Sequence, residues 1–281
     1  MVGITAKIAA AEIRRQQQLS QSIMEGQTAI SSGITLTKPS DDALAWVQVS
    51  DVARAQAQQA AWTANVKYGT GRAVNAEANL AEIGNLLNRA QELAISARNG
   101  SLNGTGQGAI LEELGTIRLT IAELLNQKDY QGTPVFDDEQ SVLVPLSRGL
   151  NLAVVGTRQS VSEGIDINGT PGSMDDMFNS VIAAMQSGDD GAVANAVDAI
   201  QAGIDHIVVE QAKQGVRSDR LDTIGERLVD VDLSLTERRA ALESTDLSEV
   251  ISQVQAKLLQ LEAAQSAFAR INKQTLFDLI G

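Results

Sequence analysis

The 281-residue sequence has little or none of several residue types, and each shortage excludes a kind of chemistry. It contains no cysteine, which excludes disulfides, thiolate metal sites and cysteine nucleophiles. Its single histidine, His206, leaves little material for a histidine metal site or a catalytic triad. Aromatic residues make up only 3%, whereas a compact globular core of this size normally uses more of them. We therefore expect no catalytic residue, no metal site and no cofactor.

Basic residues are also scarce relative to acidic ones. Lys and Arg number 22 against 35 Asp and Glu, which gives a net charge of −13. Nucleic acids and anionic membrane surfaces both attract clustered basic residues, so neither is an expected partner. No apolar run approaches the roughly 18 residues that cross a bilayer, and residues 1–18 lack the form of a cleaved signal peptide. If the protein leaves the cell, its export route must work without such a signal.

Proline, which breaks helix interiors, is concentrated in one segment. Pro134, Pro145 and Pro171 lie close together, and only Pro39 lies elsewhere. The segment between 134 and 171 also carries NG, GT and PG pairs and short runs such as VLVPL. These are turn and strand signals, so we expect a small β-hairpin region there. The remaining sequence is expected to be helical.

Apolar residues in the proline-poor segments recur at steps of three and four, as in helices that pack side by side. The row through Leu80, Ile83 and Leu87 ends at a turn signal, Asn99-Gly100-Ser101. Ser244-Thr245-Asp246 is expected to start a new helix. Further rows occupy residues 110–124, 193–207, 221–235 and 247–268. The predicted fold is mainly α: a long antiparallel helical, coiled-coil bundle forming a rod, with a small β-hairpin region.

These signals divide the chain into five predicted segments. They are an N-terminal inner helix (1–38), N-terminal rod helices (39–133), a hairpin or variable region (134–172), C-terminal rod helices (173–245) and a C-terminal inner helix (246–281). The inner helices have little to pack on except each other, so we expect them to be disordered in an isolated chain and ordered on assembly. Their apolar residues form the predicted subunit interface: Ile4, Ile8, Leu19, Ile23, Val254, Leu258, Leu261 and Phe268.

Three acidic clusters allow a different interpretation. Asp137-Asp138-Glu139 and Asp189-Asp190 are paired carboxylates of the kind that glycosidases use, although both lie in polar stretches that favour solvated loops. Ser40-Asp41-Asp42 could bind a cation, but an N-cap with acidic first-turn residues is favoured. The competing function is therefore a cell-surface ligand-binding protein or an enzyme that uses loops between 134 and 190. Under our interpretation, Asn should be tolerated at all four aspartates of the two pairs.

Several short stretches resemble the flagellin superfamily of flagellar axial proteins. Between residues 20 and 137 they are AISSG at 29–33, PSDD at 39–42, LNRAQELA at 87–94 and ARNGS at 97–101. From about 215 to 281 they are RSDRLDTIGERL and the closing apolar rows. Their order, spacing and position at both ends carry the resemblance, which covers about two thirds of the chain.

The resemblance implies a polymer-forming, structural protein. Members of this superfamily pair their N- and C-terminal helices into an inner, tube-forming layer. The implied partners are further copies or homologous axial proteins, an export chaperone and the type III export apparatus. The implied location is the extracellular bacterial flagellum, where the protein supports motility.

Within the superfamily, four stretches resemble the members of the hook–filament junction. They are PSDD at 39–42, Lys128–Gly132 with Phe136, the segment 176–215, and the ending at 276–280. Filament flagellins more often carry an AKDD-like stretch where this chain has PSDD. The short middle region departs from the larger members and predicts a small outer domain. Because minimal filament flagellins also have a short middle, a filament flagellin stays open as an alternative.

Overall fold

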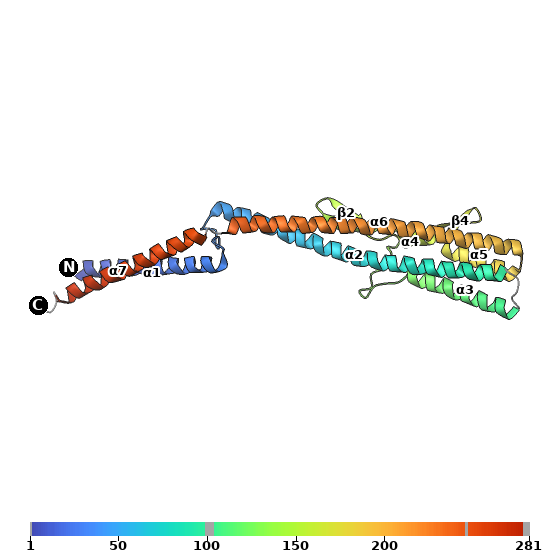
Figure 1. Ribbon diagram of the computed structural model, residues 1–281, viewed down its shortest axis with the longest axis horizontal. Helices are drawn as coiled ribbons and strands as arrows, with labels where there is room; N and C mark the ends of the chain where they lie inside the picture. The colour runs from blue at the N-terminus through green and yellow to red at the C-terminus, as the bar shows by residue number, and fades with distance from the viewer. Residues whose placement is uncertain (1, 99–103, 245–246, 278–281) are drawn as a thin grey trace. The chain divides into compact units, whose positions relative to one another are not determined.

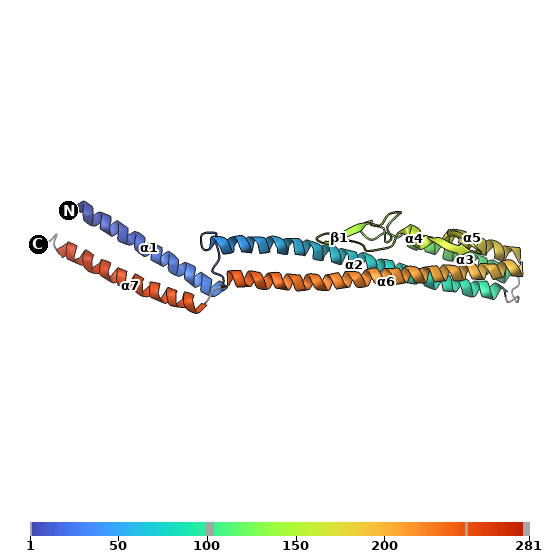
Figure 2. The ribbon, with the colours of Figure 1, turned by 90° about the horizontal axis from the view of Figure 1, so that it is seen from above.

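The computed structural model describes residues 2–98, 104–244 and 247–277, and within them the side chains of 10–98, 106–244 and 247–270. These residues form helices of very different lengths together with a few short strands (Figures 1 and 2). The helices are α1 (Val2–Ser32), α2 (Ala43–Arg98), α3 (Gly104–Leu125), α4 (Arg158–Ser162), α5 (Met174–Ser187), α6 (Asp190–Glu243) and α7 (Leu247–Phe277). The strands are β1 (Leu143–Ser147), β2 (Leu150–Ala153), β3 (Glu163–Ile167) and β4 (Thr170–Ser173). The predicted mainly α fold with a small hairpin region is confirmed.

The chain divides into two compact units. Unit 1 comprises Met1–Ala57 and Asp232–Gly281, and unit 2 comprises Gln58–Val231. Unit 1 therefore holds α1, α7, the beginning of α2 and the end of α6. Unit 2 holds the rest of α2 and α6 with all the shorter elements. The five segment boundaries expected from the sequence stay a prediction.

The core of unit 2 is built from the predicted apolar rows. Leu80, Ile83 and Leu87 of α2 are fully buried, as are Leu114 of α3 and Ile200 of α6. Small residues let the helices approach closely. At Gly69, a Cβ would lie only 3.3 Å from the Leu221 side chain of α6, and 2.9 Å from the Val154 side chain after β2. Alanines in the α2 row serve the same purpose: Ala73, Ala76, Ala90 and Ala94 are buried.

The β region consists of two separate antiparallel hairpins, β1–β2 and β3–β4, with α4 between them. The β3–β4 turn carries the NG pair, with Asn168 at φ 55° and Gly169 at φ 88°. Two successive positive φ angles are the geometry of the tight hairpin turn that Asn-Gly favours. Val144, Leu146, Leu152 and Ile165 are buried, so the hairpins add to the core of unit 2.

The helix starts expected from the sequence are present. Asp42 caps α2, because its Oδ1 accepts hydrogen bonds from the amides of Leu44 and Ala45, both at 2.9 Å. The predicted N-cap at 40–42 is thus confirmed, with Asp42 as the capping residue. The predicted acidic first turn is wrong, because α2 begins at Ala43 and its first turn holds no acidic residue. A helix restarts at Leu247 after α6 ends at Glu243, also as predicted. Residues 99–101, 245–246 and 278–280, on which other predictions depend, lie outside the described part of the chain.

One stretch of α6 is long and apolar enough, by length and composition only, to count as a candidate membrane span. The sequence pattern had indicated no run of that kind. Val193, Ile200 and Ile207 of this helix are buried in the core of unit 2. Burial in this core covers part of the stretch, of which 33% is buried.

Candidate functional site: the paired terminal helices

Helices α1 and α7 lie side by side in unit 1 (Figures 1 and 2). Gly26 of α1 faces Val254 of α7 so closely that a Cβ at position 26 would overlap the Val254 side chain. Ile23 and Val254 are buried by this pairing, at 6% and 7% exposure. A glycine at this position is therefore what allows the two helices to approach.

Six of the eight predicted interface residues have described side chains, and five of these are buried or half-buried. Ile23 and Val254 are buried, and Leu19, Leu261 and Phe268 are half-buried. Packing within the chain therefore already covers part of the surface of these side chains. Leu258 is exposed. Ile4 and Ile8 lie in the first part of α1, before residue 10, whose side chains are outside the described part.

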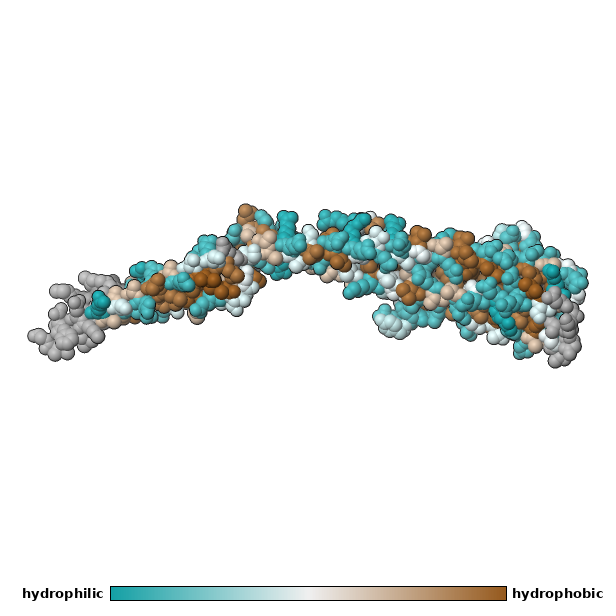
Figure 3. Space-filling view, in the orientation of Figure 1, coloured by the Kyte–Doolittle hydropathy of each residue, from teal (hydrophilic) through white to brown (hydrophobic). Residues whose placement is uncertain are grey.

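Other apolar side chains of the two helices are exposed as well. Leu247 and Ile251 of α7 belong to the apolar row predicted over 247–268, whereas Ile13 and Met24 of α1 and Leu259 of α7 were missed by sequence reasoning. Apolar side chains gather over this helix pair on the face shown in Figure 3. A single seam was followed along α7 in the sequence, and Leu259 lies off that seam. A second apolar row on the same helix was the signal that could have revealed it.

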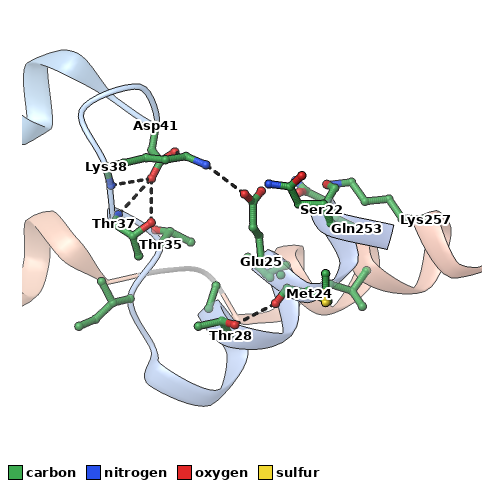
Figure 4. Close-up of a pocket in the computed structure, with 16 residues that line it drawn as sticks. Ser22, Met24, Glu25, Thr28, Thr35, Thr37, Lys38, Asp41, Gln253 and Lys257 are labelled. Atoms are coloured by element: carbon green, nitrogen blue, oxygen red, sulfur yellow. Dashed lines mark hydrogen bonds and ion pairs between the residues drawn. The ribbon is translucent and has the colours of Figure 1, made fainter. Parts of the chain in front are cut away.

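A groove of about 520 Å³ opens beside the pair, between α1, α7 and the connector of residues 33–42 that leads to α2 (Figure 4). Met24, Ile34, Val250 and Val254 supply apolar walls. Lys38 reaches from the connector to Glu25 of α1, at 3.0 Å. On the other side, Lys257 of α7 donates to the Ser22 hydroxyl at 2.5 Å.

The charges of the connector are mutually satisfied. The hydrogen bond to Glu25 raises the pKa of Lys38, and the charges of Glu25 and Asp41 add to the effect. Partial burial of Asp41 acts to raise the pKa of its carboxyl, but hydrogen bonds from the amides of Thr37 and Lys38 outweigh it, so the pKa is lowered. The side chains of Lys38 and Asp41 are 51% and 26% exposed, and ion pairs so open to solvent contribute little to stability. These contacts fix the course of the connector.

A second connection ties the connector to the end of α6. Gly33 ends α1 in a left-handed conformation, with φ 71°, as is common after a helix. The next residues of the connector pair with the end of α6. Ile34 forms a β-bridge with Ser244, and the Thr35 amide donates to the Glu243 carbonyl at 3.1 Å. The connector and the end of α6 are thus held together by a backbone hydrogen bond.

The carboxylate pairs do not form a common site. The predicted solvated loop at 137–139 is wrong for Asp137, which is 3% exposed. Its Oδ1 pairs with Arg72 of α2 at 2.8 Å, and its Oδ2 accepts from the Val142 amide at 2.6 Å. Asp138 is exposed and lies 3.5 Å from Arg158. The expected tolerance of Asn at position 137 must therefore be withdrawn.

The other candidate groups have structural partners. Asp189 caps α6, because its Oδ2 accepts from the Ala192 amide at 3.0 Å, and Asp190 lies in the first turn. His206 Nε2 lies 3.0 Å from the Ser160 carbonyl oxygen. Over the described residues, no three His, Asp or Glu side chains are placed to hold a metal ion. The apolar surface of α1 and α7 is therefore the candidate binding surface of unit 1.

A long helical bundle with two small hairpins and with paired N- and C-terminal helices defines the flagellin class of fold. Residues 4–141 match the bacterial flagellin N-terminal helical region. The matched residues make up just under half of the chain, and they show the flagellin-type N-terminal region that the sequence pattern indicated. It is similar to flagellar hook-associated protein 3 of Escherichia coli (strain K12), with 22% identity over 89% of this chain and 90% of that protein. The Salmonella typhimurium protein of the same name is 23% identical over the same shares.

Solved structures share the fold. A flagellar hook-associated protein from Vibrio parahaemolyticus has a TM-score of 0.65 and 17% identity, and the match covers 73% of this chain and 100% of that one. Bacillus cereus FlgL has a TM-score of 0.57 and 17% identity, covering 67% and 98%. The flagellar junction protein FlgL from Legionella pneumophila has a TM-score of 0.55 and 13% identity, covering 69% and 100%.

Proposed function

We propose that this chain is a structural subunit of the bacterial flagellum, of the hook-associated type that forms the hook–filament junction, and that it assembles through α1 and α7. The observation that carries the proposal is the exposed apolar surface of this helix pair, with Ile251, Leu258 and Leu259 uncovered. The similarity to hook-associated protein 3 along most of both chains supports the junction role.

When two helices pair, each buries only the face that it turns toward the other, and its outer face stays exposed. Burying a leucine or isoleucine stabilises by roughly 1.5–3 kcal/mol, so each exposed side chain on the outer faces favours association. A contact that joins different surfaces of neighbouring copies repeats without closing into a dimer. Such repetition produces the ring or tube that an axial protein requires. The predicted residues Ile4, Ile8, Leu19, Ile23, Val254, Leu258, Leu261 and Phe268 are proposed to lie in or beside this contact.

The finer parts of the proposal concern export, partners and chemistry. The chain is proposed to be secreted through the flagellar type III apparatus with an export chaperone, and to contact other axial proteins. It is proposed to have no catalytic activity. The pairing of Asp137 with Arg72 and the capping role of Asp189 support this, because both carboxylates are engaged in structure.

The assembly role is tested by placing charge on the exposed helix face. Leu259→Glu changes a side chain that is 68% exposed, so the folded chain should tolerate it. We expect it to abolish assembly in concentrated solution, measured by sedimentation. Val74→Glu, at a 56% exposed helical position of unit 2, is the matched control and should assemble. Removal of residues 250–281 should likewise leave unit 2 folded and prevent assembly. Normal assembly of the Leu259→Glu chain and of the chain without residues 250–281 would contradict the proposal.

The ordering of the terminal helices is a separate part of the proposal. We infer that α1 and α7 become fully protected only in the polymer, since in unit 2 the helices have far more buried neighbours. Amide hydrogen exchange of the dilute chain and of the polymer measures this difference. Strong protection of 1–35 and 250–281 in the dilute chain would contradict it.

The junction role is distinguished from a filament role by electron microscopy of a deletion strain. Loss of a junction subunit should leave hooks without filaments, together with secreted free flagellin. Loss of a filament subunit would instead give short or altered filaments. The rival class, a ligand-binding or enzymatic surface protein, predicts normal flagella.

A further inference from the structure

Methionine supplies every sulfur atom of this chain, because the sequence has five methionines and no cysteine. Sulfur-containing side chains are those that a peroxide oxidises most readily. Oxidation of this chain by a peroxide is therefore expected at methionine. Which methionine reacts depends on how far solvent reaches its sulfur atom.

Three of the four methionines with described side chains are buried in the core of unit 2. Met174, Met177 and Met185 are 2%, 0% and 2% exposed. The sulfur of Met177 lies so close to Gly203 of α6 that a Cβ there would stand only 2.7 Å from it. A core packed this closely leaves no room for a peroxide beside the sulfur. Met1 lies outside the described residues.

Met24 of α1 differs from these three, because it is 58% exposed. It lines the groove of about 520 Å³ between α1, α7 and the connector (Figure 4). It also lines a second hollow, beside Gln27 and Ser31 of the same helix. The helix is regular at this point, since the Thr28 hydroxyl donates to the Met24 carbonyl at 2.9 Å. A peroxide can therefore reach the side chain while α1 stays folded.

The position of Met24 gives its oxidation a consequence. Two residues beside it on α1 belong to the helix pairing: Ile23 is buried, and Gly26 faces Val254 of α7. Met24 itself forms an apolar wall of the groove. Oxidation to the sulfoxide turns a flexible apolar side chain into a polar one. Burying that polar group without a hydrogen-bond donor is unfavourable, so the apolar surface of α1 and α7 becomes a poorer contact.

We propose that Met24 is a site of oxidation by peroxides, and that its sulfoxide weakens assembly through α1 and α7; the second part rests on the proposed function. A lone pair of the thioether sulfur attacks one peroxide oxygen, the O–O bond breaks, and the other oxygen takes up a proton and leaves as water or an alcohol. Sulfur loses two electrons and the peroxide gains two. Reduction by a methionine sulfoxide reductase, with a dithiol as electron donor, restores the thioether and releases water.

The site is tested on the dilute full-length chain with hydrogen peroxide. Peptide mass spectrometry follows the gain of one oxygen at each methionine over time. We expect Met24 to react at least about tenfold faster than the three core methionines, and the rates to converge in denaturant. Similar rates in the folded chain would overturn the site. A difference that persists in denaturant would also overturn it, because burial would then not be the cause.

The effect on assembly is tested with two variants that keep good helix formers at position 24. Met24→Leu is apolar and carries no sulfur, whereas Met24→Gln places a polar, uncharged group there. Peroxide should raise the concentration needed for assembly of the unaltered chain about tenfold. It should leave Met24→Leu within about twofold. Met24→Gln should reproduce the rise without peroxide. Because Met1 is present in every chain, Met24→Leu also controls for oxidation at that residue.

The outcomes separate this inference from the proposed function. If the untreated chain assembles, and the oxidised and Met24→Gln chains assemble equally well, the link to assembly is overturned and the proposed function stands. An equal loss in peroxide-treated Met24→Leu would assign the effect to another residue and would overturn the link too. An untreated chain that does not assemble contradicts the proposed function, and with it the link, while the oxidation rates still decide whether Met24 is the site.

Discussion

Asp137 and Arg72 form a charged pair inside unit 2, with side chains 2% and 6% exposed. Both carboxylate oxygens are used, one by Arg72 and the other by the Val142 amide. Arg72 also donates to the Pro134 carbonyl, so a single residue of α2 holds two points of the segment between α3 and β1. A buried pair of this kind fixes one arrangement of the backbone, because breaking it leaves an uncompensated charge.

Replacing Asp137 with Asn should therefore destabilise the chain. Removing one partner of a buried ion pair typically costs about 3–5 kcal/mol. Chemical denaturation followed by circular dichroism measures the change. Asp138→Asn is the control, because that side chain is 71% exposed, and its effect should stay within about 0.5 kcal/mol. Equal stability of the two variants would show that the Arg72 contact is unimportant.

Asp176 provides a pH-dependent contact at the start of α5. Hydrogen bonds from the Ser173 hydroxyl and amide lower the pKa of its carboxyl, as part of a capping box. A lowered folded-state pKa stabilises above the ordinary carboxyl range of about 4, and the stabilisation is lost as pH falls through the lowered value. Ser173→Ala should return the Asp176 pKa toward its ordinary value, measured by NMR titration of the carboxyl carbon. An unchanged pKa in that variant would contradict the assignment.

At the residue scale, local sequence predicted a helix cap but not the buried pair. Asp42 caps α2 in the stretch where the sequence predicted a cap. Asp189 was expected in a solvated loop, and it caps the helix that follows it. Asp137 lies in a run of three acidic residues that suggests solvent exposure, and its partner Arg72 lies on another element. No local pattern indicates such a partner.

At the scale of elements, the spacing of apolar residues predicted the helices and their buried faces. Leu221, Ile224 and Leu228 of α6 are buried as the row indicated, but Val231 of the same row is 40% exposed. The difference reflects the neighbours: α3, α5 and the hairpins belong to unit 2, which ends at Val231. The apolar row predicted which face of α6 is buried. It did not predict how many other elements are present along the helix to cover that face.

The close approach of α1 and α7 gives an element-scale prediction. Gly26→Val should push the helices apart, because even a Cβ would overlap the Val254 side chain. We expect reduced assembly, measured by sedimentation, with unit 2 still folded by circular dichroism. Gly71→Val is the matched control, since nothing lies within 4 Å of a Cβ at that helical position. Equal loss of assembly in both variants would assign the effect to valine in a helix and not to helix pairing.

At the scale of the whole molecule, charge is unevenly distributed along the chain. Residues 58–231 contain 12 Lys and Arg against 23 Asp and Glu, a net charge of −11. The terminal segments 2–32 and 247–277 contain 6 basic and 4 acidic residues, a net charge of +2. Neighbouring copies therefore repel through unit 2 and do not repel strongly through the helices proposed to join them.

Assembly should accordingly depend on salt. Raising ionic strength from about 0.01 to 0.15 M shortens the screening length from about 30 to 8 Å, which weakens repulsion between the acidic units. We expect the concentration needed for assembly to fall over this range, measured by light scattering. Apolar contacts of the terminal helices should persist because they do not depend on charge. A rise in that concentration with salt would indicate that attraction between opposite charges drives assembly instead.

The pairing of α1 with α7 also determines the order in which the chain can fold. Residues 33–246 separate the two helices, so α1 has no partner until α7 has been synthesised or exported. Closing so long a loop is slow compared with forming contacts between neighbouring helices. Unit 2 should therefore fold early and bring the two ends together, and the α1–α7 contact should form last. A surface that matures last cannot join neighbouring copies prematurely, which gives the chain time to reach its place of assembly.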